Sequence, residues 1–183
     1  MVPLSMLWLP ILLSAVFVFF ASFILWMALP FWHARDTGRI QDDTAVVNAF
    51  RKAKSGQYVI PWMDWKNLTP EQRAEAQKGP SALVWLRNPL AFSFPRTLVL
   101  AFLHGLLVAL FVGYLTGRAR PAGTEYLEVF RFAATSGFMA FALRGISDSI
   151  WFGKPWKITV KDTIDALIYG SLMGGTFGWL WPS

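Results

Sequence analysis

The stretch from Asp162 to Trp181 reads DTIDALIYGSLMGGTFGWLW, and the fold of the chain depends on it. No residue in it after Asp165 is charged, so about 20 residues are available to cross the roughly 30 Å of hydrocarbon in a bilayer. Small residues recur in it at every fourth position, namely Ala166, Gly170, Gly174 and Gly178. Because these positions share one face of a helix, another backbone can approach closely there. The stretch therefore predicts a membrane helix with a packing face.

The composition of the whole chain is that of a membrane protein. Of its 183 residues, 55% are hydrophobic and 15% are charged, whereas about 25% of the residues of a soluble domain are charged. We expect an all-α membrane protein with four transmembrane helices and a small cytoplasmic or interfacial α(+β) cap between the first two. The helices are predicted at residues 4–32, 97–117, 125–148 and 162–181, and the cap at residues 33–96.

The distribution of Lys and Arg predicts the orientation of these helices. Ten of these residues lie between Trp32 and Arg96, and three more lie at Lys154, Lys157 and Lys161. The connecting segment on the opposite side has only two such residues, Arg118 and Arg120. Because positive charge is retained in the cytoplasm, we expect the cap inside and both termini on the periplasmic side.

The cap itself contains signals for short elements. Asp42 and Asp43 precede apolar residues at helical spacing, and Gly56 follows, which predicts a short amphipathic helix. The sequence Thr69-Pro70-Glu71-Gln72 is a capping box with proline at the first helical position, which predicts a second helix. Residues 57–62 are predicted to be extended, and residues 81–86 are either a strand beside them or a segment that lies on the membrane surface.

The segment from residue 97 to residue 117 repeats the pattern of the opening stretch. Ala101, Gly105, Ala109, Gly113 and Gly117 are again four residues apart. This face and the one in residues 162–181 would run parallel, so they could meet at a close crossing. Either face could instead bind a second copy or a foreign subunit.

Polar residues at membrane depth are the candidates for chemistry. His104 and Tyr169 are each about 10 Å deep from the cytoplasmic side at 1.5 Å per residue, so they could touch. The candidate cluster consists of His104, Arg144, Asp148, Asp165 and Tyr169. It would form a titratable pocket if all five faced inward. We favour the structural alternative, in which the charged residues reach water at the helix ends and His104 bonds to Tyr169 within the bundle.

The sequence predicts no catalytic residues, no metal site and no cofactor. It has no cysteine, which excludes disulfides, thiolate metal sites, iron–sulfur clusters and covalently attached haem. A metal site from His104, Asp148 and Asp165 is chemically permissible, but no local ligand spacing supports it. The positive charge is explained by membrane orientation and lipid headgroups, so no nucleic-acid partner is expected.

Several motifs together resemble those of a known family. They are LWLPILLSAV at residues 7–16, GQYVIP and KGP in the cap, YLEVFRFA, DSIW at residues 148–151, and DALIYG through GTFGWLWP at the end. The chain resembles a family of small four-span bacterial inner-membrane proteins of uncharacterised function. The resemblance implies a bacterial inner-membrane location and no catalytic residues.

Two functions follow as expectations. The first is a non-enzymatic integral membrane protein that self-associates or serves as a small accessory or structural subunit of a larger membrane complex, for example a bioenergetic one. The alternative is a small transporter or lipid-acting enzyme that uses the His/Asp/Tyr pocket in the cytoplasmic half. The expected partners are the lipid bilayer and either further copies or the larger complex.

Overall fold

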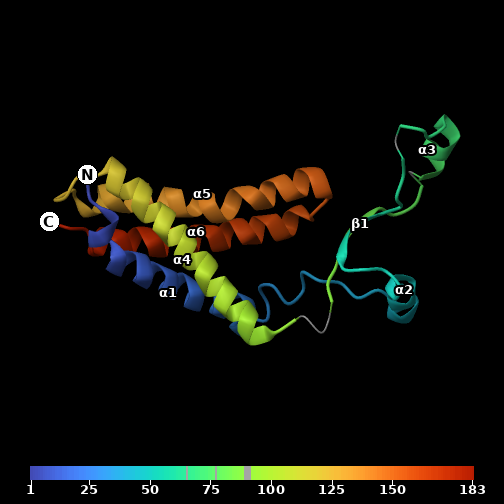
Figure 1. Ribbon diagram of the computed structural model, residues 1–183, viewed down its shortest axis with the longest axis horizontal. Coiled ribbons are helices and arrows are strands. Elements are labelled where there is room, and N and C mark those ends of the chain that lie inside the picture. Colours follow the sequence, from blue (N-terminus) through green and yellow to red (C-terminus); the bar gives the residue numbers. More distant parts are fainter. Residues whose placement is uncertain (65, 77, 89–91) are drawn as a thin grey trace. The chain divides into compact units, whose positions relative to one another are not determined.

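The computed structural model describes residues 1–64, 66–76, 78–88 and 92–183. In this part the chain is mostly helical, with six α-helices and one two-stranded sheet, which confirms the expected helical class. The chain divides into two compact units, called here unit 1 (Met1–Gly38 and Pro95–Ser183) and unit 2 (Arg39–Phe94). Figure 1 labels the elements of both units.

Unit 1 contains four of the helices. They are α1 (Trp8–Phe23), continued by a π-helical turn η2 (Ile24–Ala28); α4 (Phe94–Ala119), whose first residue belongs to unit 2; α5 (Tyr126–Phe152); and α6 (Trp156–Trp179). A short 3₁₀ turn, η1 (Leu4–Met6), precedes α1. Gly153 ends α5 with a φ of 69°, a conformation that glycine adopts without steric cost.

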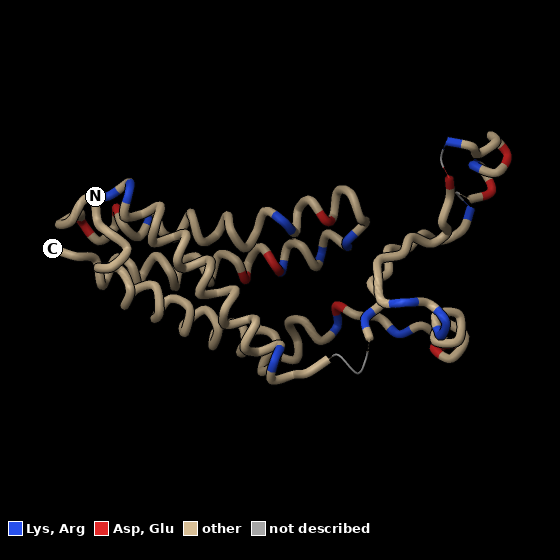
Figure 2. The backbone as a smooth tube through the Cα atoms, viewed as in Figure 1, with Lys and Arg blue, Asp and Glu red and all other residues tan. Residues whose placement is uncertain are grey.

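Two of the described helices are long and apolar enough to cross a membrane by length and composition. They are Trp8–Ala28, which joins α1 to η2, and α4. Only 22% and 28% of their most apolar windows are buried inside the protein, so their apolar side chains are mostly exposed. Figure 2 shows neither basic nor acidic residues along α1 or the central part of α4. The helices α5 and α6 are not among the helices that meet this criterion, and charged residues lie within both.

The helices α5 and α6 are the most closely packed pair. A Cβ atom at Gly174 would lie 2.7 Å from the Ala134 Cβ and 2.8 Å from the Phe130 carbonyl oxygen. One at Gly170 would lie 2.6 Å from the Ala134 carbonyl oxygen. Since real Cβ atoms do not approach so closely, only glycine permits this helix separation. The small-residue face of α6 therefore packs on α5.

The small-residue face of α4 packs on a different element. A Cβ at Gly117 would lie 2.5 Å from the Val2 carbonyl oxygen, and one at Gly113 would lie 3.0 Å from the Ile11 side chain. The predicted crossing of the two small-residue faces is therefore wrong, since α6 uses its face on α5 and α4 uses its face on α1 and the N-terminal segment. A Cβ at Gly113 would also lie 3.2 Å from the Phe177 side chain of α6, but it would not meet the glycines of that helix.

Both chain termini lie beside the connection between α4 and α5. The Val2 amide donates to the Gly117 carbonyl at 2.8 Å, and the Gly123 amide donates to the Pro182 carbonyl at 2.8 Å. The N and C labels in Figure 1 lie at this end of unit 1. The two termini of unit 1 are therefore on the same side of its helices.

The observed boundaries differ from the expected ones at several helix ends and at the start of the cap. The helix α4 runs from Phe94 to Ala119 and not over residues 97–117, and α5 ends at Phe152 and not at residue 148. The last helix begins at Trp156 and not at residue 162, because the charged turn before Asp162 is also helical. Residues 33–38, which were assigned to the cap, belong to unit 1. Their side chains pack against α6, as described below.

Unit 2 contains α2 (Asp43–Phe50), β1 (Gly56–Ile60), α3 (Pro70–Ala76) and β2 (Ala82–Leu86). The strands are antiparallel, with Gly56 opposite Leu86, so the paired-strand alternative is confirmed. The capping box is confirmed too: the Gln72 amide donates to Thr69 Oγ1 at 3.2 Å and the Thr69 amide donates to Gln72 Oε1 at 3.0 Å.

The α5–α6 contact predicts the effect of Gly174→Leu. A branched side chain would have to displace the backbone of α5, and overpacking of this kind costs about 1–3 kcal/mol. We expect a lower thermal unfolding midpoint in detergent. Leu172→Ala lies off the small-residue face and should have a smaller effect. Equal effects of the two substitutions would contradict the close contact.

The capping box predicts the effect of Thr69→Ala. Loss of the side-chain acceptor should cost about 1 kcal/mol of local helix stability. Amide exchange in α3 should become faster, and hydrogen–deuterium exchange would measure this. Unchanged exchange would mean that other contacts hold α3.

Candidate functional site

The best-defined polar site lies where the segment after η2 meets α6. Pro30 follows the helix and cannot donate a backbone hydrogen bond, so the chain leaves the helical path there. Two turns follow, in which the Trp32 amide donates to the Leu29 carbonyl and the Asp36 amide donates to the His33 carbonyl. These turns direct Trp32, His33 and Asp36 toward α6.

The carboxylate of Asp165 on α6 is at the centre of the site and is only 2% exposed. The Trp32 indole donates to its Oδ1 at 2.7 Å, and His33 Nε2 lies 2.9 Å from its Oδ2. Each carboxylate oxygen therefore has a partner from the segment after η2. A buried carboxylate requires such partners, because water does not solvate it.

His33 connects Asp165 to a second carboxylate. Its Nδ1 lies 2.6 Å from Asp36 Oδ2, and its ring stacks on Trp26 with a centroid separation of 3.9 Å and an interplanar angle of 8°. Ionised carboxylates only accept hydrogen bonds, so both ring nitrogens of His33 must donate when both acids are ionised. The His33 ring is therefore held between two carboxyl groups, one at each of its nitrogens.

Lys161 adds a second basic side chain to the site. Its ammonium contacts Asp36 Oδ1 and the Trp32 carbonyl oxygen, and lies 5.7 Å from the centroid of the Trp32 ring. The site thus joins the carboxyl groups of Asp36 and Asp165 to one histidine and one lysine. We call these residues together with Trp32 the buried ionic cluster.

The surroundings of Asp36 lower the pKa of its carboxyl group. The hydrogen bond from Lys161 is the main cause, burial of the group acts in the opposite direction, and the hydrogen bond to His33 lowers the pKa further. The folded protein therefore binds the proton at Asp36 less readily than the unfolded chain does.

A cavity of about 250 Å³ lies beside the buried ionic cluster. Two ion pairs lie at it: Arg144 Nε donates to Asp148 Oδ1 at 3.0 Å, and Lys154 bonds to Asp162. The Tyr169 hydroxyl also borders it, and is buried near Ser22 and Trp26 without a well-formed hydrogen bond among the described residues. The lining residues are Trp26, Phe141, Arg144, Gly145, Asp148, Lys154, Asp162, Asp165 and Tyr169.

Four of the five residues of the candidate cluster line this cavity, and His104 does not. The His104 ring contacts the edge of Phe141 at 5.7 Å, and Phe141 in turn contacts Tyr169 at 5.3 Å. The expected hydrogen bond between His104 and Tyr169 is therefore wrong, because Phe141 lies between them. His104 is exposed on α4.

Sequence reasoning missed the role of His33. The expected topology has the loop after residue 32 and the start of the last helix on the same side of the membrane, and Asp36 follows His33 by three residues. Neither fact places the His33 ring against Asp165, because the turns after Pro30 determine its direction. Of the two histidines, His104 is the more conspicuous in the sequence, because it lies inside an apolar helix. Its side chain is nevertheless exposed.

The arrangement of the buried ionic cluster is that of a structural contact between two segments and not that of a catalytic site. Both nitrogens of His33 are occupied by carboxylates, so neither can take a proton from a nucleophile. The two carboxylates lie on opposite sides of the imidazole ring and do not converge on one point. Among the described residues, no three His, Cys, Asp or Glu side chains could hold a metal ion.

Comparison with protein-family models, curated proteins and solved structures found no match. The site is therefore interpreted from its own geometry.

The lowered pKa of Asp36 predicts a loss of stability in acid. The stabilisation is fully present above the ordinary value of 3.8 and is lost as the pH falls through the lower pKa of the folded state. We expect Asp36→Asn to be less stable than the wild type at pH 7 and to lose less stability between about pH 5 and pH 2. Chemical denaturation midpoints across this range would measure the difference.

Asp43→Asn is the matched control, since Asp43 is an exposed carboxylate paired with Arg39 on the surface. It should keep the acid sensitivity of the wild type. Parallel acid profiles for the wild type and Asp36→Asn would contradict the assignment.

Proposed function

We propose that the protein is a non-enzymatic membrane protein of the bacterial inner membrane that crosses the bilayer four times and self-associates through α4. Both termini would lie in the periplasm and unit 2 in the cytoplasm. The proposal rests on the surface properties of the helices, on the charge distribution and on the exposed histidine of α4.

The lengths and surfaces of α5 and α6 support their assignment as the third and fourth spans. They contain 27 and 24 residues, or about 40 and 36 Å of helix at 1.5 Å per residue. Charged residues within α5 pair with each other, Arg131 with Glu128 at 2.8 Å and Arg144 with Asp148 at 3.0 Å. This pairing reduces the free-energy cost of placing the charges near the membrane. Large apolar side chains such as Leu143 and Leu167 are more than half exposed, as a lipid-facing surface requires.

The position of the termini and the charges support the orientation. Both termini lie at one end of unit 1, which requires an even number of crossings. Unit 2 and the α5–α6 connection carry most of the Lys and Arg residues, and such segments are retained in the cytoplasm.

The single observation that carries self-association is the exposure of His104. This residue lies ten positions after Phe94, about 15 Å along α4, near the middle of an apolar helix. An imidazole exposed to lipid is unfavourable and normally faces a protein partner. Leu100, Leu107 and Phe111 share its face and are 54%, 51% and 59% exposed, so most of this face is uncovered, although the His104 ring contacts Phe141 of α5.

A second copy of the chain is the occupant that this face suits best. In a two-fold contact the same patch meets itself, so His104 of one copy would lie near His104 of the other. A neutral imidazole has one donor and one acceptor, and the pair could therefore form a hydrogen bond inside the membrane. The glycines of α4 and α6 are already used within the chain and are not needed for this contact.

The cavity beside the buried ionic cluster supports a second candidate, a small transporter or lipid-acting enzyme. Its support is that Arg144, Asp148, Asp165 and Tyr169 border one cavity. We rank it second, because the acids there are already paired and the described residues at the cavity include no nucleophile beside a free base.

Introduced cysteines test the orientation, since the chain has none of its own. Ser183→Cys should react with an impermeant thiol reagent in intact cells, and Ser55→Cys should react only after lysis. The reverse labelling pattern would contradict the proposed orientation.

Native mass spectrometry in mild detergent tests the self-association. We expect the wild type to be a dimer, and His104→Leu to shift the population toward monomer by about fivefold, the equivalent of one interhelical hydrogen bond of about 1 kcal/mol. Val99→Ala changes an exposed residue of α4 that points more than about 100° away from His104 around the helix, and should leave the dimer intact. A monomeric wild type, or one bound only to a foreign protein, would contradict self-association.

A further inference from the structure

Unit 2 contains a groove whose floor is apolar. The groove lies between α2 and the end of β2 and has a volume of about 620 Å³. Val46, Val47 and Phe50 of α2 and Leu86 of β2 line it. Val47 is 61% exposed, so this floor offers apolar surface that the protein itself does not cover.

Three cations line the same groove. They are Arg51 and Lys54, which follow α2, and Arg87, which follows β2. Arg51 donates to the Asn48 side chain at 2.8 Å and Arg87 lies 4.5 Å from the centroid of the Phe92 ring. Among the ion pairs of the described residues, none includes any of these three cations. Their positive charge is therefore not neutralised within unit 2.

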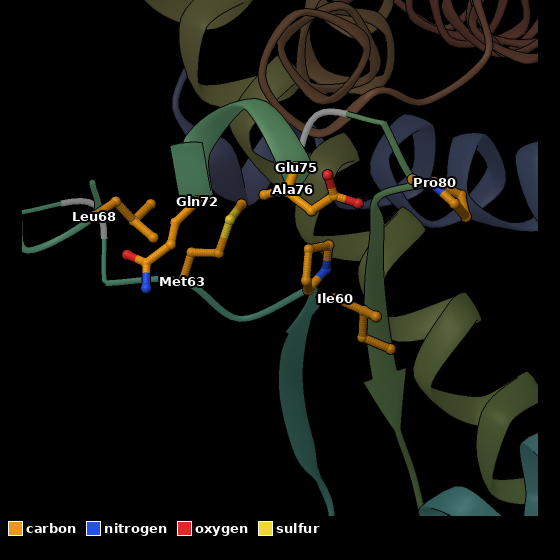
Figure 3. A pocket seen from close by; sticks show the side chains of 9 residues that line it. Ile60, Met63, Leu68, Gln72, Glu75, Ala76 and Pro80 are labelled. Atoms are coloured by element: carbon orange, nitrogen blue, oxygen red, sulfur yellow. The ribbon is translucent and has the colours of Figure 1, made fainter. Parts of the chain in front are cut away.

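A second hollow in unit 2 shows that this combination is particular to the groove. It has a volume of about 560 Å³ and lies between α3 and the end of β1 (Figure 3). Its lining is largely apolar, as at Met63 and Leu68, but its one charged residue is Glu75. Of these two hollows, only the groove beside α2 combines an apolar floor with a cationic rim.

We propose that the groove binds the headgroup of an anionic phospholipid. The phosphodiester would lie among Arg51, Lys54 and Arg87, and the glycerol and first acyl carbons would cover Val46, Val47 and Phe50. Charge complementarity selects an anionic over a zwitterionic lipid, since basic side chains near a surface are attracted by its negative potential. The bilayer is the source of the ligand, because unit 2 is joined at both ends to the two apolar helices. This inference rests on the membrane location proposed above.

Hydrogen–deuterium exchange of the full chain in nanodiscs tests the proposal. Nanodiscs of phosphatidylcholine alone are compared with nanodiscs that contain phosphatidylglycerol as well. We expect slower amide exchange in α2 and β2 when phosphatidylglycerol is present. The protection should fall by about fivefold for each cation removed. It should therefore be lost in the triple variant that combines Arg51→Gln, Lys54→Gln and Arg87→Gln.

A charge-matched variant provides the control. Lys66→Gln, Arg73→Gln and Lys78→Gln remove the same charge from the part of unit 2 around α3, and should leave the protection intact. Val47→Asn tests the apolar floor, and should reduce protection without any change in charge.

Equal exchange in the two kinds of nanodisc would overturn the groove as a lipid site and leave the membrane location standing. An equal loss of protection in the two triple variants would overturn it in favour of unspecific charge attraction. Protection by an acidic peptide in phosphatidylcholine nanodiscs, with none from phosphatidylglycerol, would overturn it in favour of a protein partner. Failure of the chain to enter nanodiscs would overturn both proposals.

Discussion

The contact between His33 and Asp165 is the interaction on which the arrangement of unit 1 depends. Asp165 is buried on α6, and its two oxygens are bound by Trp32 and His33. A buried carboxylate without partners would cost several kcal/mol, so α6 can keep this residue only while the segment after η2 remains in place. The buried ionic cluster therefore joins the end of the first apolar helix to the last helix, across most of the sequence.

Glycine packing determines the rest of unit 1 and leaves one surface unused. The close approach of α5 and α6 requires Gly170 and Gly174, and the approach of the N-terminal segment to α4 requires Gly117. These contacts need no charge and tolerate an apolar surrounding. They also occupy the small-residue faces, so association with another copy has to use a different face. The face that contains His104 is available for it.

Local patterns in the sequence were reliable where one residue determines the structure near it. Thr69 and Gln72 form the predicted capping box, and the predicted strand pair forms, because short-range hydrogen bonding determines these elements. The choice of helix partners was not predictable, since the period of four shows that a face packs closely and not on which helix. His104 was misplaced for the same reason: depth follows from residue count, but the rotation of α4 about its axis depends on Gly113 and Gly117. The buried ionic cluster was missed because the irregular turns after Pro30 bring His33 back to α6.

A double-mutant cycle between His33 and Asp165 tests the central claim most directly. His33→Gln, Asp165→Asn and the double variant would be compared with the wild type by reversible chemical denaturation in detergent. If the two side chains stabilise the fold through their mutual contact, the free energies of unfolding should be non-additive by about 1–3 kcal/mol. Additive effects, equal within about 0.5 kcal/mol, would show that the two residues act independently and would contradict the account.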